Sequence, residues 1–266
     1  MSAPIAVTIA GLDPSGGAGI AADLKTFSAL GVYGAAVVTA LTAQNTKGVF
    51  GIYDVPADFI AAQIDAVFTD LAVGAVKIGM LGSPAAIDVV AAALDRYRPR
   101  NVVLDPVMVA SSGQSLLRGD ALGRLRDLIA RVRLLTPNLP EAAALLETAL
   151  ARDEAEMGAQ AQKLLALGAG AVLIKGGHGG GAESVDLLLD TSGQVLRLAA
   201  PRIATENTHG SGCTFASAIA AGLAKGLPLP AAAREAKAYV SAAIAAADRL
   251  AVGSGHGPLH HYHAWW

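Results

Sequence analysis

The chain has 266 residues, of which 53% are hydrophobic and 16% charged, so it can form a sizeable core and is not a disordered chain. Its net charge of −2, without basic blocks or interleaved aromatic residues, argues against nucleic-acid binding. No apolar run approaches the roughly 20 residues of a membrane-spanning helix, so we expect no membrane partner. The single cysteine, Cys213, and the lack of a secretory signal predict a cytoplasmic protein.

Short apolar runs alternate with longer Ala- and Leu-rich stretches along the chain. The runs predict strands at Ile5–Ala10, Ala35–Leu41, Val49–Val55, Ala75–Ile78, Val102–Leu104, Leu134–Leu135 and Ala171–Ile174. Their continuous apolar character is typical of strands buried on both faces of a parallel sheet. The stretches between them predict crossover helices at Ile20–Leu30, Pro56–Phe68, Pro84–Tyr97 and Glu154–Leu167.

The C-terminal third predicts a hairpin, two helices and a tail. Leu187–Leu189 and Val195–Leu198 flank a turn-forming Asp-Thr-Ser-Gly segment, which indicates an antiparallel hairpin near one sheet edge. Helices are predicted at Thr214–Lys225 and Pro230–Leu250. Residues 253–266 are rich in Gly, His and Trp, and we expect a surface tail without a metal site, because no Cys or carboxylate completes its histidines.

The order of these elements predicts one α/β domain over residues 1–266, since neither a linker nor a repeat interrupts it. The expected fold is a doubly wound, mostly parallel central sheet with helices on both faces. In such sheets ligands bind at the carboxyl ends of the strands. Polar residues follow the predicted strands at Asp13, Gln44, Asn45, Asp105, Asn138 and Lys175.

The strongest local motif is Asn207-Thr-His-Gly-Ser-Gly-Cys-Thr214, which leads directly into a predicted helix. Gly210 and Gly212 allow backbone N–H groups to converge at the helix N-terminus, which creates an anion site. The alternative is that these glycines only form a tight turn before the helix. Cys213 lies in the first helical turn, where a thiol pKa tends to fall, so it could act as a weak base or orient an acceptor hydroxyl. It could equally be a small buried residue.

Three further sites carry polar residues suited to phosphate and metal. Lys175 ends a strand beside two glycines and could place a charge on a nucleotide phosphate. Asp105 ends another strand, and Asn138 and Glu141 lie three residues apart near a helix start. These oxygen ligands suit Mg²⁺. Ordinary helix capping by Asn138 and Glu141 is the competing interpretation, and spacing alone favours it.

The glycines of Gly17-Ala-Gly19-Ile-Ala-Ala22 have the spacing of a dinucleotide-binding fingerprint. Five residues separate them from the strand end at Gly11, however, and no acidic residue follows the next strand to bind a ribose. We therefore interpret them as glycines that let the backbone approach a small flat ligand. Asp23, one turn into the next helix, could face that ligand or be solvated.

Taken together, these motifs resemble the bacterial hydroxymethylpyrimidine/phosphomethylpyrimidine kinases of the ribokinase-like superfamily, which act in thiamine biosynthesis. The resemblance covers essentially the whole chain, in order, and rests on Ala10–Gly19, Thr39–Thr46, Lys77–Leu81, Asp105–Val107, Thr136–Asn138, Lys175–His178 and Asn207–Thr214. It implies ATP and Mg²⁺ as co-substrate and cofactor, two successive phosphorylations of a small pyrimidine, and a homodimer, for which strand Val49–Val55 is a candidate contact.

The resemblance also implies roles for individual residues. Gln44 would hydrogen-bond the aminopyrimidine edge, because its amide offers a donor and an acceptor. The ring would be framed by Gly11, Asp23, Val107 and Met80, and the nucleotide would meet Lys175, Asn138 and Thr208. Asp105 and Glu141 would lie near the metal, and catalysis would involve Gly210, Gly212, Cys213 and Lys175. Sugar kinases of this superfamily carry an Asp base where this chain has Cys213.

Three other functions remain open from the sequence. A pyridoxal kinase is the nearest, and Gln44 with Met80 favours the pyrimidine over it. A dinucleotide-dependent oxidoreductase would explain the glycine spacing at Gly17–Ala22, but not the second anion site at Gly210–Cys213. A non-catalytic metabolite-binding domain would keep the pocket without the chemistry, but nothing in the sequence supports it, because every expected catalytic position is filled.

Overall fold

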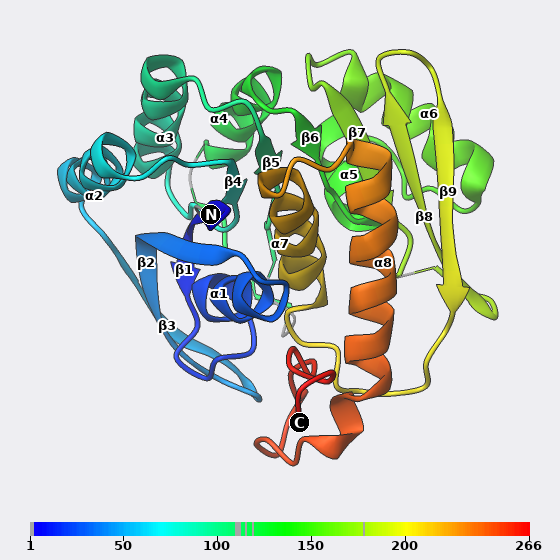
Figure 1. The fold of residues 1–266 in the computed structure, drawn as a ribbon. Helices are drawn as coiled ribbons and strands as arrows, with labels where there is room; N and C mark the ends of the chain where they lie inside the picture. The colour runs from blue at the N-terminus through cyan, green and yellow to red at the C-terminus, as the bar shows by residue number, and fades with distance from the viewer. Residues whose placement is uncertain (1–2, 110–112, 115, 119, 178) are drawn as a thin grey trace.

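The computed structural model describes residues 3–109, 113–114, 116–118, 120–177 and 179–266 (Figure 1). Within these residues nine strands form one sheet in the order β3-β2-β1-β4-β5-β6-β7-β8-β9. Their bounds are β1 (Ile5–Leu12), β2 (Tyr33–Asn45), β3 (Gly48–Asp54), β4 (Ala75–Ile78), β5 (Val102–Leu104), β6 (Leu134–Leu135), β7 (Ala171–Lys175), β8 (Glu183–Asp190) and β9 (Val195–Pro201). Every predicted strand is present, although β2 and β8 are longer than predicted.

The centre of the sheet is parallel and both edges are antiparallel. Strand β1 pairs in parallel with β2 and β4, and the parallel pairing continues through β5, β6 and β7. At one edge β3 runs antiparallel to β2, and at the other the β8–β9 hairpin extends from β7. Every residue of β4, β5 and β6 is buried, as expected for strands covered on both faces. The predictions of a mostly parallel sheet and an edge hairpin are confirmed.

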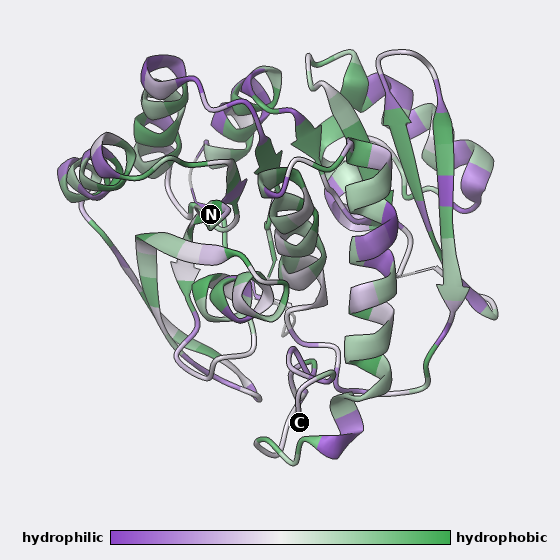
Figure 2. Cartoon of the chain, viewed as in Figure 1, coloured by the Kyte–Doolittle hydropathy of each residue, from purple (hydrophilic) through white to green (hydrophobic). Residues whose placement is uncertain are grey.

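Helices cover both faces of the sheet, as predicted (Figure 1). One hydrophobic cluster joins the sheet to α1, α7 and α8, and a second joins it to the other five helices. The bounds are α1 (Gly19–Ala29), α2 (Ala57–Asp70), α3 (Pro84–Tyr97), α4 (Ala121–Leu128), α5 (Leu139–Leu146), α6 (Glu154–Leu165), α7 (Ser211–Ala224) and α8 (Leu229–Ala245). Figure 2 shows hydrophobic residues concentrated on the central strands. No helix in the described residues has the length and hydropathy needed to cross a membrane.

The tail is exposed at residues 253–256 and 264–266, as predicted, but residues 257–261 are buried, which corrects the prediction for the middle of the segment. His260 and His261 are only 2% and 4% exposed, and Leu259 is 1% exposed. The backbone of His209 pairs with Pro258 in a β-bridge, and the His261 side chain contacts Thr214 in the first turns of α7. In Figure 1 the red tail accordingly lies beside the N-terminal end of α7. Neutral imidazoles can be buried when they are hydrogen-bonded, which composition alone does not reveal.

The topology brings distant polar residues to one edge of the sheet. The parallel strands β1, β4, β5, β6 and β7 all end on the same side, and the N-terminus of α7 opens towards it. The residues after these strand ends therefore converge around the start of α7, as doubly wound sheets require of their ligand sites.

Candidate active site

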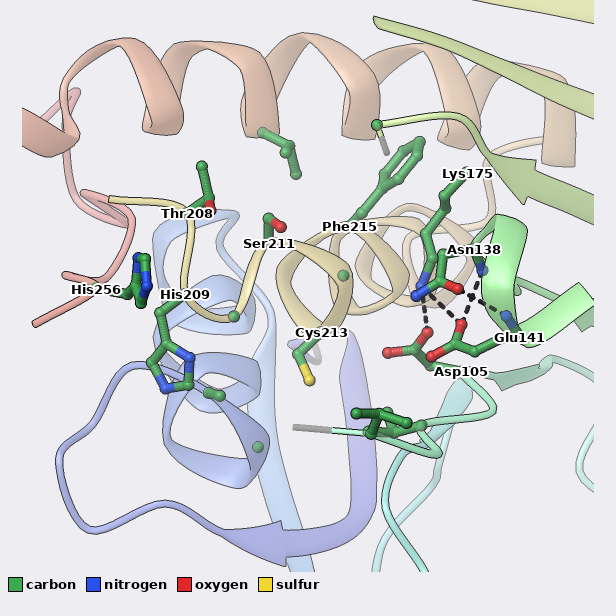
Figure 3. Close-up of a pocket in the computed structure, with 18 of the residues that line it drawn as sticks. Asp105, Asn138, Glu141, Lys175, Thr208, His209, Ser211, Cys213, Phe215 and His256 are labelled. Atoms are coloured by element: carbon green, nitrogen blue, oxygen red, sulfur yellow. Dashed lines mark hydrogen bonds and ion pairs between the residues drawn. The ribbon is translucent and has the colours of Figure 1, made fainter. Parts of the chain in front are cut away.

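A cavity of about 730 Å³ lies at this edge of the sheet (Figure 3). Twelve of the thirteen residues predicted to form the site line it, and the exception is Asp23. Those twelve are Gly11, Gln44, Met80, Asp105, Val107, Asn138, Glu141, Lys175, Thr208, Gly210, Gly212 and Cys213. The structure thus brings together residues that are as far as 202 positions apart, between Gly11 and Cys213.

The glycine loop before α7 forms the middle of the cavity. Gly210 has φ of 81°, in the left-handed region, and a Cβ there would lie 1.9 Å from the carbonyl oxygen of Gly17. A Cβ on Gly212 would lie 3.1 Å from Nζ of Lys175. Gly210 thus satisfies the tight-turn interpretation, while Gly212 keeps the space beside the lysine open. The start of a 14-residue helix supplies partial positive charge at the same point.

Cys213 lies half-buried on the cavity wall, in the first turn of α7. Burial raises the pKa of its thiol to about 11, although nearby Lys77 lowers it. The sequence suggested the opposite direction because of the helix N-terminus, and burial outweighs that effect. The thiol is therefore protonated at neutral pH, which argues against a thiolate base and leaves it able to donate a hydrogen bond.

Lys175, Asp105 and Glu141 form a charged cluster on one side of the cavity (Figure 3). Nζ of Lys175 is 2.5 Å from Oδ1 of Asp105 and 3.9 Å from Oε2 of Glu141. Burial raises the pKa of Glu141 to about 7, while Lys175 lowers it and Asp105 raises it further. The Lys175 pKa is raised because the two carboxylates outweigh burial, so its ammonium remains charged.

Asn138 and Glu141 also cap α5, so the competing interpretation of this pair is correct as well. Oδ1 of Asn138 accepts a hydrogen bond from the Glu141 backbone, and Oε2 of Glu141 accepts one from the Asn138 backbone, both at 2.8 Å. This capping box fixes the Glu141 carboxylate beside Lys175. One residue pair therefore starts the helix and aims a carboxylate into the cavity.

The donor set fits Mg²⁺ shared with a nucleotide better than a metal held by protein alone. Among the described residues, no group of three or more His, Cys, Asp or Glu side chains could hold a metal ion. Mg²⁺ commonly takes only one or two carboxylates, together with waters and substrate phosphates. Asp105 and Glu141 supply two carboxylates, and both line the cavity.

Another part of the cavity lining is apolar and forms the slot that we assign to a ring. Met80 packs with Ala40 and Leu116 in a small hydrophobic cluster that Val107 joins. A Cβ on Gly11 would lie 3.1 Å from Sδ of Met80, so glycine keeps the slot open. Half-buried Gln44 also lines this cavity and adds a polar side chain to it. The arrangement suits a small flat ring with a polar edge.

Asp23 does not line the cavity, which corrects the expectation that it frames the ring or is solvated. Its carboxylate is fully buried and accepts hydrogen bonds from Thr8 and Ser217, both at 2.6 Å. Nζ of Lys77 lies 2.9 Å away, also fully buried. Asp23 therefore ties α1 to β1, β4 and α7, and its influence on the site is indirect.

The structure adds an ion pair, between half-buried Lys237 and buried Asp186, that the sequence analysis missed. Nζ of Lys237 in α8 lies 2.7 Å from Oδ2 of Asp186 in β8, and Oδ1 of Asp186 accepts a hydrogen bond from the Gly176 backbone. Both charged residues line the cavity. The only sequence signal was an acidic residue directly before an apolar run, which is too common to be informative.

Comparison with known proteins gives the family. The chain matches the family described as phosphomethylpyrimidine kinase over residues 13–260. It belongs to the phosphomethylpyrimidine kinase family. The hydroxymethylpyrimidine/phosphomethylpyrimidine kinase of Rhizobium meliloti is 57% identical over 263 residues, which cover 98% of each chain. The family assignment and its kinase chemistry are therefore shown, and the predicted ribokinase-like fold agrees with the solved structures of this and a related kinase.

Two solved structures, one of a pyridoxal kinase and one of a phosphomethylpyrimidine kinase, are similar to this chain. An ADP complex of pyridoxal kinase from Bacillus subtilis aligns with a TM-score of 0.90 at 35% identity, covering 99% of both chains. The phosphomethylpyrimidine kinase of Clostridium difficile aligns with a TM-score of 0.79 at 42% identity, covering 90% of this chain and 99% of that one. The backbone of this chain therefore aligns closely with a pyridoxal kinase as well as with a phosphomethylpyrimidine kinase.

Proposed function

We propose that the protein is an ATP- and Mg²⁺-dependent kinase of thiamine biosynthesis that phosphorylates 4-amino-5-hydroxymethyl-2-methylpyrimidine and then its monophosphate. One observation carries this proposal: a single cavity is lined by the apolar slot residues, by Gln44, and by a glycine loop with Lys175. Transfer of a phosphoryl group from ATP to a small aromatic alcohol requires a site that binds the ring and an adjacent site that binds the phosphates. The family assignment agrees with this division.

In the first transfer, the slot would hold the ring with its hydroxymethyl group towards the start of α7. The backbone N–H groups around Gly210 and Gly212 and the helix N-terminus would stabilise the charge on the moving phosphoryl group. Lys175 would pair with a phosphate oxygen. Asp105 and Glu141 would hold Mg²⁺, which supplies charge neutralisation to the phosphates when bound.

Cys213 would act as a hydrogen-bonding group and not as a thiolate. A protonated thiol beside the acceptor can orient its oxygen, and phosphoryl transfer depends mainly on positioning and charge stabilisation. In the second transfer the acceptor is already a phosphate, which needs little deprotonation. The proposal therefore requires no strong base at this position.

The second candidate is a pyridoxal kinase, supported by the TM-score of 0.90 to the Bacillus subtilis protein. A pyridoxal-type ring also carries a hydroxymethyl group. Gln44 favours the pyrimidine, because its amide can pair at once with a ring nitrogen and an exocyclic amine. The identity to the Rhizobium meliloti protein is also higher than to the pyridoxal kinase.

The deciding experiment incubates the protein with ATP, Mg²⁺ and either hydroxymethylpyrimidine or pyridoxal, with products followed by mass spectrometry. We expect the pyrimidine monophosphate first and its diphosphate later. Lys175→Met should abolish both products, whereas Lys225→Met, an exposed lysine at the end of α7, should not. Pyridoxal phosphate as the sole product would assign the chain to the second candidate.

We further propose a homodimer that pairs through the β3 edge. Strand β3 ends the sheet and exposes Phe50 and Tyr53 at 71% and 67%, next to Leu41 of β2 at 43%. Exposed apolar edge strands commonly pair with another chain. Sedimentation analysis should give a dimer for the unmodified protein and a monomer for Phe50→Glu.

The single cysteine supports a cytosolic location.

A further inference from the structure

Three side chains on the rim of the ring slot form a chain of contacts that the proposed function leaves unexplained. Nε2 of His209 lies 2.9 Å from Oδ2 of Asp13 and 3.4 Å from the amide nitrogen of Gln44. Asp13 and His209 are 3% and 6% exposed, whereas Gln44 is half-buried at the cavity. Nε2 of His209 therefore contacts both Asp13 and Gln44. Whether this nitrogen carries a proton determines whether it donates a hydrogen bond to these neighbours or accepts one from them.

The surroundings of Asp13 place that proton on Nε2. Asp13 accepts hydrogen bonds from the backbone and hydroxyl of Ser15, at 2.8 and 2.7 Å, and from the Ala18 backbone at 3.0 Å. Burial raises the pKa of Asp13, but the hydrogen bonds from His209 and Ser15 together lower it by more. The pKa of Asp13 is therefore below its ordinary value. An ionised carboxylate only accepts, so Nε2 of His209 must carry the proton that it donates to Asp13.

A protonated Nε2 cannot also accept from the amide nitrogen of Gln44. The hydroxyl of Thr42 gives the second clue, because its one proton is directed to the carbonyl oxygen of Leu12 at 2.9 Å. Its lone pairs are then available to the other end of the Gln44 amide, which lies 3.2 Å away. Both conflicts are removed if the amide is turned over, since its oxygen and nitrogen have nearly the same shape. The amide oxygen then accepts a longer, shared contact from the Nε2–H group that donates mainly to Asp13, and the amide nitrogen donates to Thr42.

We infer that His209, held by Asp13, is a positioning residue that fixes the Gln44 amide with its oxygen towards His209 and its nitrogen towards Thr42. The second amide proton and the second oxygen lone pair are then left for the ligand. That pattern offers one donor and one acceptor side by side, which matches a ring nitrogen next to an exocyclic amine. The inference rests on the proposed function for its substrate, but the amide orientation itself does not.

The packing around His209 keeps its ring in this position. A Cβ on Gly17 would lie 2.4 Å from Cδ2 of His209, so the glycine gives the ring its space and leaves little for rotation. The His209 backbone N–H donates to the Gly257 carbonyl at 3.1 Å. Gly210, the first residue of the glycine loop, follows directly. Ring recognition and phosphate binding are therefore held by adjacent residues.

The protonated nitrogen can be tested without any substrate. Long-range proton–nitrogen NMR spectra of protein labelled with ¹⁵N-histidine resolve the six imidazoles, and the signal absent from His209→Gln identifies His209. We expect a proton on Nε2 of His209. A ring protonated only on Nδ1 would overturn the inference, whether or not the protein phosphorylates a pyrimidine.

A double-mutant cycle tests whether His209 acts through Gln44. His209→Leu should raise KM for hydroxymethylpyrimidine about tenfold, the effect of one lost hydrogen bond in the bound state, with a smaller change in kcat. His209→Gln keeps a donor and should recover most of the loss. In a Gln44→Ala background, His209→Leu should change KM by less than about twofold.

Equal effects of His209→Leu in both backgrounds would contradict the inference, because they would show a merely structural role. His263→Leu, on the tail outside the cavity, is the matched control and should leave KM unchanged. If the unmodified protein phosphorylated neither ring, the proposed function would fail, and the NMR result would still decide the position of the His209 proton on which the amide orientation rests.

Discussion

His261 should make the stability of the protein depend on pH through a contact with the glycine-loop helix. Its Nε2 lies 3.0 Å from Oγ1 of Thr214, whose own proton is directed to the Gly210 carbonyl at 2.9 Å. His261 therefore donates, and it does so at 4% exposure. Burial lowers its pKa from 6.5 to about 4, and the positive charge of Lys25 contributes in the same direction.

The size of the effect follows from these two pKa values. Because the folded-state pKa is below the unfolded value, the stabilisation is present above about pH 6.5 and is lost as pH falls towards 4. At pH 5 the unfolded chain binds a proton at His261 that the folded chain largely excludes, which costs about 2 kcal/mol in the free energy of unfolding.

Urea unfolding at pH 7.5 and pH 5.0 measures this difference. The unmodified protein should lose about 2 kcal/mol more than His261→Gln between these two pH values, because the variant has no imidazole to protonate. His256→Gln changes an exposed tail histidine and should retain the pH dependence of the unmodified protein. Identical pH dependence in the His261→Gln and unmodified proteins would refute the reasoning.

Three further predictions concern other buried ionisable groups. Since the pKa of Cys213 is about 11 and that of an ordinary thiol is 9.0, iodoacetamide should alkylate it about a hundredfold more slowly at pH 8 than an exposed cysteine in a peptide. The raised pKa of Glu141 removes stability as pH increases from 4.5 towards 7, so Glu141→Gln without Mg²⁺ should become more stable relative to the unmodified protein over that range, as urea unfolding would show. Lys77→Met leaves Asp23 buried without its cation and should cost about 3–5 kcal/mol in urea unfolding, and adding Asp23→Asn should recover at least half.

The fold could be predicted largely because its central strands are short and uniformly apolar. Ala75–Ile78, Val102–Leu104 and Leu134–Leu135 have the predicted bounds, since burial on both faces leaves an uninterrupted apolar run. Helix α4 was missed because Gly123 and its charged residues obscure the apolar positions that pack against the sheet. Periodicity is weak evidence in a helix of only two turns.

The sequence could predict which residues meet at the site, because the sheet topology determines their positions. It could not predict the properties of those residues that depend on burial. The carboxyl ends of parallel strands had to meet, so Asp105, Asn138 and Lys175 lie around one cavity. The direction of the Cys213 pKa and the position of Asp23 depend on which neighbours remove water from them. Those neighbours come from distant segments, and no local pattern specifies them.

The charged cluster of Lys175, Asp105 and Glu141 also explains how a charged nucleotide could bind without leaving an unpaired charge in the protein. Asp105 neutralises Lys175 at 2.5 Å, and Glu141 lies close enough to contribute. A phosphate oxygen arriving with a divalent cation would offer the lysine an anion and the carboxylates a cation at the same time. Each buried charge then exchanges one partner for another, which avoids the cost of an unpaired buried ion. Either component alone would leave one side of the cluster unmatched, so nucleotide and cation should bind more tightly together than separately.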